Sequence, residues 1–357
     1  MIKKLLTVLS SIIVGLIVVE LSLKFFNLKK ADIYFWNKRY MLFSNNGDDV
    51  FHNKKNIFTY KPNSEIFSKT YYDINGKFVK EYDYKFSTNN YGLVQLQLIK
   101  PNLSSTILLG DSFTEGKGFT PWFNLLNYNI FKDPQVINGG LLGTGFQQWK
   151  VLLDELIEDN FIINNVYVIF ISSDFTRDIW NFSNESLICI KNFKLCDENN
   201  LFFGMPDDEI KTINFLNKMK IQRENKKNSS VFDYLKNFFD GIRNLSRIAR
   251  YELRILRKKR NNSMIRNEKT IKQLIDTYKN NVTFLHLPEK TEIYANKKNY
   301  NGIMAESFIM KNTQNYYDLN LLCNFNINDY YKIDGHFNAT GYRKLVDCFQ
   351  KIVSSKK

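Results

Sequence analysis

One serine and one aspartate–histidine pair supply the residue types that nucleophilic catalysis requires. Ser112 follows an apolar run in the segment TILLGDSF, and Asp334 precedes His336 by two positions in the segment DGHFN. A serine hydroxyl is a poor nucleophile at neutral pH, so it needs an imidazole to take its proton and a carboxylate to orient that imidazole. We therefore take Ser112, His336 and Asp334 as candidates for nucleophile, base and orienting acid.

The chain contains three histidines, and the other two are weaker candidates than His336 for the base. His286 stands inside the strand-like segment FLHLP, where a hydrogen-bonded structural histidine is the better interpretation. His52 lies in a loop-rich stretch without a carboxylate motif beside it. Histidines this far apart, without clustered acidic or cysteine ligands, predict no metal site. Nothing in the sequence indicates a cofactor.

A glycine-rich loop follows the apolar run 135–138. Two glycines come directly after Asn138, and Gly143-Thr144-Gly145 follows shortly afterwards. Accessible backbone amides in such a loop can stabilise an oxyanion. The alternative is a nucleotide-binding loop, but the G-x-G-x-x-G spacing, a following Lys-Ser or Lys-Thr and an obvious acidic ribose ligand are all missing. The loop therefore favours acyl chemistry over nucleotide binding.

Apolar runs predict the strands that must position these residues. Four runs, separated by helical patterns, occupy residues 106–109, 135–138, 166–171 and 282–287. Strands that alternate with helices in this way form a parallel sheet covered on both faces. We therefore expect an α/β fold. Ligands in such folds bind beyond the carboxyl ends of the strands, which is where Ser112 is expected.

Helical periodicity is clearest in two segments. Asn338 is a predicted N-cap, and the apolar residues from Tyr342 to Val353 form one stripe after it. The segment 147–159 also carries one apolar stripe, made by Trp149, Leu152, Leu153, Leu156 and Ile157. A capped helix directly after Asp334 and His336 is suited to hold the imidazole at the edge of the sheet.

As a set, these motifs resemble those of the SGNH (GDSL-like) hydrolase family. The matching segments are GDSF at 110–113, NGGLLGTG at 138–145 and DGHFNATGY at 334–342, in the family's order within residues 101–355. The resemblance implies a three-layer α/β/α fold with a central parallel sheet. It also implies that Ser112 is the nucleophile, His336 the general base and acid, and Asp334 its orienting partner. The amides of Ser112 and Gly143 are then the implied oxyanion donors.

One family position differs in this sequence. The family carries an Asn before an Asp after the third strand, and the Asn side chain completes the oxyanion hole. Here Ser173 precedes Asp174 at that place. A hydroxyl is shorter than an amide, and losing one oxyanion donor costs about 10²- to 10³-fold in turnover. We predict that Ser173 is a weaker third donor; the alternative is that it caps a turn or the next helix.

The N-terminus predicts export. Two lysines precede the apolar run 5–19, which continues past Glu20 to Phe26. No small-x-small cleavage pattern follows, which favours a retained single-pass signal anchor at 1–27 over a cleaved signal peptide, with a buried soluble helix as a weaker alternative. The remaining chain is then expected on the periplasmic, extracytoplasmic side of an inner membrane. The four cysteines suit that compartment. Either two disulfides in one of three pairings or free thiols fit the sequence.

Two segments outside the core motifs have their own patterns. Residues 28–100 are aromatic and polar with turn signals at 45–48, 75–76 and 89–92, which predicts a hairpin- and loop-rich extension before a hydrolase-like domain at 101–357. An insertion at about 182–269 contains the basic segment 231–260, interpreted as one long helix. Its basic face could contact anionic lipid, although a solvated helix face is the more ordinary interpretation.

The net charge of +14 results from 50 basic and 36 acidic residues. The lysines are scattered, and no helix-turn-helix, RNP or zinc-finger pattern accompanies them, so nucleic-acid binding is not predicted. The sequence is interpreted as a membrane-anchored, exported serine esterase that acts on acyl esters, such as acetyl esters, of envelope polysaccharide or lipid. The alternatives are an O-acyltransferase and a catalytically weakened carbohydrate-binding or scaffold protein on the same fold.

Overall fold

The computed structural model describes residues 38–227 and 262–355, except 75 and 120, together with Ser11 and Gly15. The predicted anchor at 1–27 and the predicted helix at 231–260 therefore lie outside the described residues, apart from those two positions. Within the described residues, no helix is both long and apolar enough to cross a membrane.

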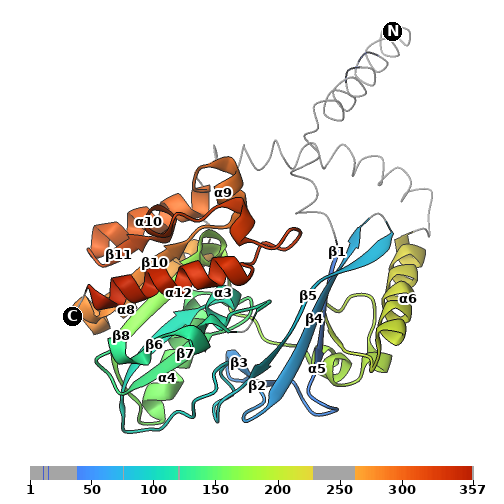
Figure 1. Cartoon of the computed structure of the whole chain (residues 1–357), viewed down its shortest axis with the longest axis horizontal. Coiled ribbons are helices and arrows are strands. Elements are labelled where there is room, and N and C mark those ends of the chain that lie inside the picture. Colours follow the sequence, from blue (N-terminus) through green and yellow to red (C-terminus); the bar gives the residue numbers. More distant parts are fainter. Residues whose placement is uncertain are drawn as a thin grey trace.

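A five-stranded parallel sheet forms the centre of one half of the molecule (Figure 1). Its strand order is β11-β10-β8-β6-β7, and every neighbouring pair is parallel. The strands are β6 (Ser104–Gly110), β7 (Gln135–Gly140), β8 (Ile162–Ile171), β10 (Val282–Leu287) and β11 (Tyr316–Asp318). The four predicted strands are confirmed, and the α/β fold class with them. The short edge strand β11 is additional.

Helices cover both faces of this sheet. Along β6, Ile107 and Leu109 pack into one apolar cluster, whereas Leu108 between them packs into another. The first cluster joins the sheet to α4 (Phe146–Glu158), α8 (Asn262–Tyr278) and α10 (Tyr300–Asn312), and the second joins it to α12 (Ala339–Ser354). The alternation along β6 is the expected consequence of a strand buried on both sides.

The predicted helices are observed with small differences. Asn338 caps α12, because its side chain accepts hydrogen bonds from the amides of Thr340 and Gly341. The apolar stripe of α4 is buried as expected up to Leu156. Ile157 is 45% exposed, because it lies one residue before the end of the helix and turns away from the core.

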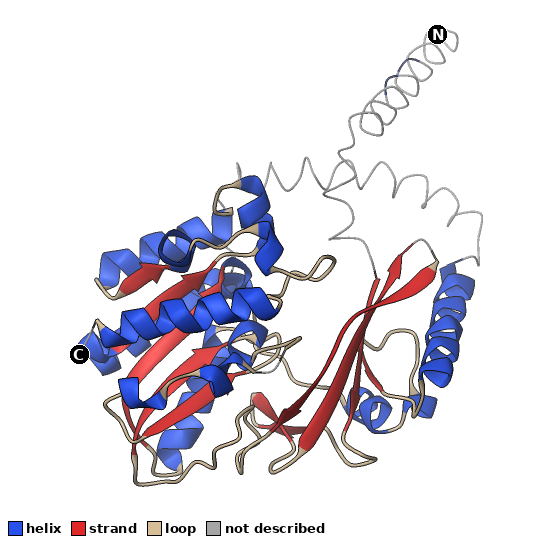
Figure 2. Ribbon diagram, viewed as in Figure 1, coloured by secondary structure: helices blue, strands red, loops and turns tan. Residues whose placement is uncertain are grey.

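The N-terminal extension contains two hairpins, and one of them belongs to a second sheet. Its order is β5-β4-β1-β9, formed by β1 (Lys38–Ser44), β4 (Glu65–Ile74), β5 (Lys77–Ser87) and β9 (Phe202–Gly204). The long hairpin β4–β5 turns at the predicted position 75–76, where Gly76 has a φ of +88°. A small hairpin, β2 (Phe51–Lys54) and β3 (Ile57–Tyr60), follows β1. Figure 2 shows this sheet standing beside the parallel-sheet half.

The insertion is divided between the two halves. Its first part contains α5 (Asn184–Lys191), β9 and α6 (Glu209–Lys227). Residues from α5, β9 and α6 share an apolar cluster with Tyr40 and Leu42 of β1. Its last part begins α8, which packs on the parallel sheet. The described part of the insertion therefore completes the N-terminal sheet and begins α8.

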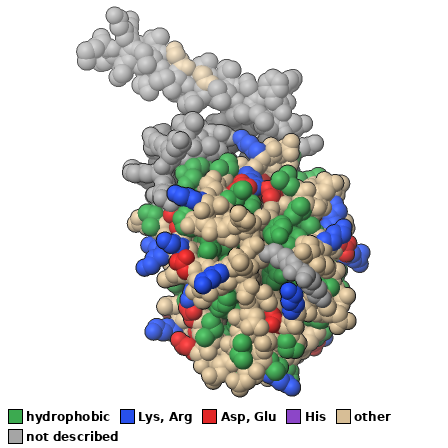
Figure 3. Space-filling view, turned by 90° about the vertical axis from the view of Figure 1, so that its left-hand side faces the viewer, with side chains coloured by type: hydrophobic (Ala, Val, Ile, Leu, Met, Phe, Trp, Pro, Cys, Tyr) green, Lys and Arg blue, Asp and Glu red, His purple; other side chains and the backbone are tan. Residues whose placement is uncertain are grey.

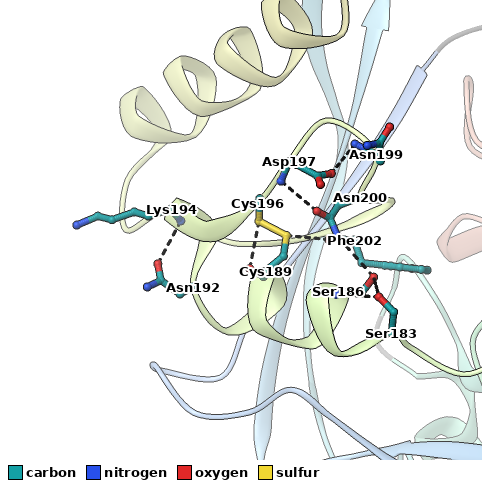
Figure 4. Close-up of a disulfide and its surroundings, with 10 residues drawn as sticks. All are labelled: Ser183, Ser186, Cys189, Asn192, Lys194, Cys196, Asp197, Asn199, Asn200 and Phe202. Atoms are coloured by element: carbon teal, nitrogen blue, oxygen red, sulfur yellow. Dashed lines mark hydrogen bonds between the residues drawn. A yellow bond between two sulfur atoms is a disulfide. The ribbon is translucent and has the colours of Figure 1, made fainter. Parts of the chain in front are cut away.

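Two disulfides form, so of the two alternatives that the sequence left open the structure has disulfides and not free thiols. Cys189 of α5 is bonded to Cys196, and Cys323 at the end of α11 (Leu319–Cys323) is bonded to Cys348 of α12. Figure 4 shows the Cys189–Cys196 bond beside Phe202 of β9. Of the three pairings that the sequence allowed, the structure selects this one.

The surface carries both signs of charge. On the face that Figure 3 displays, basic side chains are dispersed among acidic and apolar ones. This distribution agrees with the interpretation that the positive net charge reflects scattered lysines.

Candidate active site

The nucleophile candidate stands at the junction of β6 and the short helix α3 (Ser112–Glu115). Asp111 caps the helix by accepting a hydrogen bond from the amide of Phe113, at 2.9 Å. Gly110 is required before it, because a Cβ atom there would lie 2.4 Å from the carbonyl oxygen of Ile169. The tight turn therefore places Ser112 beyond the carboxyl end of a central strand, as the sequence predicted.

The structure brings Ser112, His336 and Asp334 together. The Ser112 hydroxyl lies 2.8 Å from His336 Nε2, and His336 Nδ1 lies 2.5 Å from Asp334 Oδ1. The three residues are 4%, 8% and 2% exposed. Their order in space is that of a serine triad, with the imidazole between the hydroxyl and the carboxylate.

The surroundings of His336 keep it neutral and suited to act as a base. Burial lowers the pKa of His336 below its usual value, although the neighbouring Asp334 carboxylate acts in the opposite direction. Burial would raise the pKa of Asp334, but the fields of His336, Arg39 and Lys117 outweigh it and hold that pKa well below its usual range. Asp334 is therefore ionised, and a neutral His336 donates its Nδ1–H to it and accepts the Ser112 proton at Nε2.

The glycine loop lies next to the nucleophile. The amide of Leu141 donates to the carbonyl of Gly110 at 3.0 Å, which joins the loop to the turn before Ser112. Gly143 has a φ of +72°, and its carbonyl accepts a hydrogen bond from the Trp180 indole at 3.0 Å. Within the described part of the chain, the amides of Ser112 and Gly143 have no acceptor. Both are therefore free to donate to a developing oxyanion.

Ser173 has a different partner from the predicted one. Its amide donates to Glu289 Oε1 at 3.0 Å, and its hydroxyl donates to the same oxygen. The other carboxylate oxygen of Glu289, Oε2, accepts a hydrogen bond from the Asn299 side chain at 3.0 Å. A hydroxyl bound to a carboxylate is not available to an oxyanion. The contacts therefore favour the alternative that Ser173 stabilises the turn after β8.

A second serine–histidine pair lies on the neighbouring strands. Ser172 follows β8 and lies 2.9 Å from Nε2 of His286, which belongs to β10. Ser172 also donates to Glu292 Oε1 at 2.6 Å, so its proton is committed to that carboxylate. His286 then donates its Nε2–H to Ser172, and its Nδ1 lies 3.2 Å from the Tyr316 hydroxyl.

This second pair is structural. His286 cannot take a proton from Ser172, because the nitrogen that faces the serine already carries one. Burial lowers the pKa of His286 to about 3, so the ring remains neutral. Gly302 packs so tightly here that a Cβ atom would lie 2.2 Å from Ser172 Oγ. The interpretation of His286 as a hydrogen-bonded structural histidine is confirmed.

Arg177 joins three segments of the site and was not predicted. Its Nη1 atom lies 2.9 Å from Asp111 Oδ2, 2.9 Å from the carbonyl of Thr144 and 2.5 Å from Asp174 Oδ1. It therefore connects the nucleophile turn, the glycine loop and the turn after β8. An Asp three positions before an Arg at the end of a strand was a sequence signal for an ion pair, but nothing in it indicated Asp111.

Two buried ionisable side chains near the triad, Lys117 and Glu115, were not predicted from the sequence. Lys117 is 1% exposed, and burial lowers its pKa to about 7. Glu115 is equally buried, accepts a hydrogen bond from the Tyr60 hydroxyl at 2.9 Å, and has its pKa raised to about 7 by burial. Among the described residues, no group of histidine, cysteine or acidic side chains is arranged to hold a metal ion.

No family model matches the sequence, and no curated protein matches it. The functional argument therefore depends on the geometry of the site itself.

Proposed function

We propose that this protein is a serine hydrolase of the SGNH type that cleaves acyl esters. The observation that carries the proposal is the continuous line from the Ser112 hydroxyl through His336 to Asp334, at the carboxyl end of a parallel strand. The two free amides beside Ser112 add the electrostatic component that acyl transfer requires. The order of the motifs in the chain supports the family resemblance.

The reaction follows from the positions of the protons. Ser112 Oγ attacks the ester carbonyl while its proton moves to His336 Nε2, and Asp334 stabilises the imidazolium that forms. The amides of Ser112 and Gly143 bind the oxyanion. When the intermediate collapses, the ester C–O bond breaks and His336 returns the proton to the leaving alcohol. Water or a sugar hydroxyl then attacks the acyl-enzyme carbonyl while His336 takes its proton. The bond between the acyl carbon and Ser112 Oγ breaks, and His336 returns the proton to Ser112. Water gives hydrolysis, and a sugar hydroxyl gives acyl transfer.

The proposed substrates are acyl esters, such as acetyl esters, of envelope polysaccharide or lipid. The two disulfides support an oxidising, extracytoplasmic location. With residues 1–27 proposed as the membrane anchor, residues 28–37 span at most about 35 Å before β1 begins. Arg39 near the start of β1 acts on Asp334. The catalytic site is then close to the membrane surface, which favours substrates held there.

A fluorophosphonate probe tests this proposal, because it reports an activated serine without knowledge of the substrate. We expect the wild-type protein to be labelled and the Ser112→Ala variant to remain unlabelled, with a melting temperature close to that of the wild type. Ser172→Ala is the matched control, since it removes another buried serine that lies against a histidine. Labelling that persists in Ser112→Ala and disappears in Ser172→Ala would overturn the assignment.

The contact between Ser173 and Glu289 supports one second candidate function. It removes the hydroxyl expected to be the third oxyanion donor and leaves two backbone amides. A site with two donors turns over more slowly than one with three. A carbohydrate-binding or scaffold protein with residual esterase activity would therefore bind an acylated polysaccharide firmly and cleave it slowly.

A further inference from the structure

The N-terminal sheet contacts the triad carboxylate directly. Asp334 Oδ1 is occupied by His336, through its ring at 2.5 Å and its amide at 3.2 Å. The other oxygen, Oδ2, accepts a hydrogen bond from the hydroxyl of Tyr82 at 2.7 Å. Tyr82 belongs to β5, and both it and Asp334 are buried. The second half of the molecule therefore supplies a short hydrogen bond to the oxygen of this carboxylate that His336 does not bind.

The same strand also holds the loop that carries Asp334. The neighbouring residue Glu81 accepts a hydrogen bond from the amide of Ile333 at 2.8 Å. The Tyr82 ring packs against Tyr331, with their centroids 4.6 Å apart. Lys290 of α9 (Lys290–Ala295) also donates to the carbonyl of Lys332 in this loop, at 2.9 Å. The loop is thus fixed between β5 and α9.

Two further groups of the N-terminal sheet act on Asp334. Arg39 of β1 and Tyr72 of β4 are directly paired across their antiparallel strands, and both interact electrostatically with Asp334. The Tyr72 side chain also makes a hydrogen-bonding contact with Asp334. Tyr72 is buried, but much of the Arg39 side chain is exposed. Because solvent and salt screen an exposed charge, Arg39 contributes less than its proximity suggests. The Tyr82 hydroxyl, by contrast, is buried and donates a short hydrogen bond to Asp334 Oδ2, 2.7 Å long.

We propose that Tyr82 is a positioning residue of the catalytic site: its hydroxyl fixes Asp334 so that the carboxylate holds His336 in line with Ser112. This inference rests on the proposed function. A carboxylate bound through one oxygen alone can rotate about its Cβ–Cγ bond, and the imidazole that depends on it then loses its orientation. The hydroxyl at Oδ2 prevents that rotation and stabilises the buried charge. The N-terminal sheet is thereby a part of the catalytic unit.

The inference also predicts a change in proton affinity. The charged groups that act on His336 are Asp334, Lys117 and Arg39. Asp334 additionally interacts with Tyr72, Tyr82, Tyr84, Glu81, Lys290 and Tyr331, but the Tyr84 hydroxyl makes no hydrogen bond to it. The Tyr82 hydroxyl takes up part of the Asp334 charge. Without it, that charge acts more fully on the imidazolium, and the pKa of His336 rises.

The test compares Tyr82→Phe with Tyr84→Phe in the full-length protein. Tyr84 lies two positions further along the same strand, and its buried hydroxyl makes no hydrogen bond to Asp334. With p-nitrophenyl acetate as the probe, we expect Tyr82→Phe to lower kcat about tenfold with KM changed less than about twofold. The acid limb of its kcat/KM profile should move to higher pH, because catalysis requires neutral His336. Tyr84→Phe should match the wild type in both respects.

A second measurement does not depend on turnover. The chain has three histidines, so the imidazole signals can be assigned by NMR and the titration of His336 followed directly. We expect its midpoint to rise in Tyr82→Phe and to stay unchanged in Tyr84→Phe. If the two variants agree with each other in kcat and in the His336 midpoint, the inference is wrong. If the wild type neither cleaves the ester nor reacts with the fluorophosphonate, the proposed function fails, while the titration still decides the role of Tyr82.

Discussion

Replacing Arg177 with methionine should destabilise this protein more than the loss of any exposed ion pair. Arg177 is the cation for two aspartates that are almost completely buried, Asp111 at 1% and Asp174 at 0% side-chain exposure. Its Nη1 atom lies 2.9 Å from Asp111 and 2.5 Å from Asp174. Methionine occupies a similar volume but leaves both carboxylates without a positive partner.

The magnitude follows from this burial. Removing one partner of a buried ion pair costs about 3–5 kcal/mol, because the remaining charge is left in a medium of low polarity. The free energy of unfolding of an ordinary domain is about 5–15 kcal/mol. The Arg177→Met variant should therefore lose a large fraction of its free energy of unfolding. Urea denaturation of the purified ectodomain, with the free energy of unfolding extrapolated to water, measures this loss.

The loss should also depend on pH. Burial raises the pKa of Asp174 well above its usual value, and the Arg177 charge opposes that rise. A carboxyl with a raised folded-state pKa contributes stability that is present at low pH and is lost as the pH rises through that pKa. Without Arg177 the pKa of Asp174 rises further, so the difference between variant and wild type should be larger at pH 8 than at pH 5.

Arg266→Met provides the matched control. Arg266 pairs with Asp178, but these side chains are 51% and 55% exposed. Exposed pairs contribute about 0–1 kcal/mol. The reasoning is refuted if Arg177→Met loses no more stability than Arg266→Met, or if its loss is the same at pH 5 and pH 8.

Two further predictions concern the triad and the glycine loop. The charge of the buried Lys117 lowers the pKa of His336, and Lys117→Met removes that charge. The pKa of His336 should therefore rise, and the acid limb of the kcat/KM profile should move to higher pH. If the acid limb does not move, the Lys117 charge does not act on His336. Gly143→Ala forces a side chain onto a residue with a φ of +72° and brings its Cβ atom 3.2 Å from the Trp180 ring. This should cost about 1–2 kcal/mol of stability and lower kcat by at least about tenfold, whereas unchanged turnover would remove the Gly143 amide from the oxyanion site.

The strands and the triad could be predicted from the sequence because both leave local patterns. Buried parallel strands appear as apolar runs, and each run led to a strand within a few residues of the observed one. The turn before Ser112 needs glycine, and the helix after His336 needs a cap. The sequence showed the first requirement at Gly110 and the second at Asn338.

The N-terminal half of the site could not be predicted in the same way. Tyr82 meets Asp334 across 252 positions of the chain, and no periodicity marks such a pairing. The parallel pairing of β9 with β1 is equally remote, because it joins Phe202 to Met41. Ser173 illustrates the other limit. Its position after the third strand was correct, but its partner Glu289 follows a different strand and decides the direction of the hydroxyl.

The two serine–histidine pairs explain why residue types alone do not define a nucleophile. In both pairs a serine hydroxyl lies within 3 Å of an imidazole Nε2, at 2.8 Å for Ser112 and 2.9 Å for Ser172. They differ in which member of the pair, the histidine or the serine, the carboxylate binds. Asp334 binds the far nitrogen of His336, which leaves Nε2 free to accept the Ser112 proton. Glu292 binds the serine itself, so Ser172 gives its proton to the carboxylate and His286 must donate to Ser172. The position of one acidic side chain therefore separates the serine that we propose as the nucleophile from the serine whose proton is committed to a carboxylate.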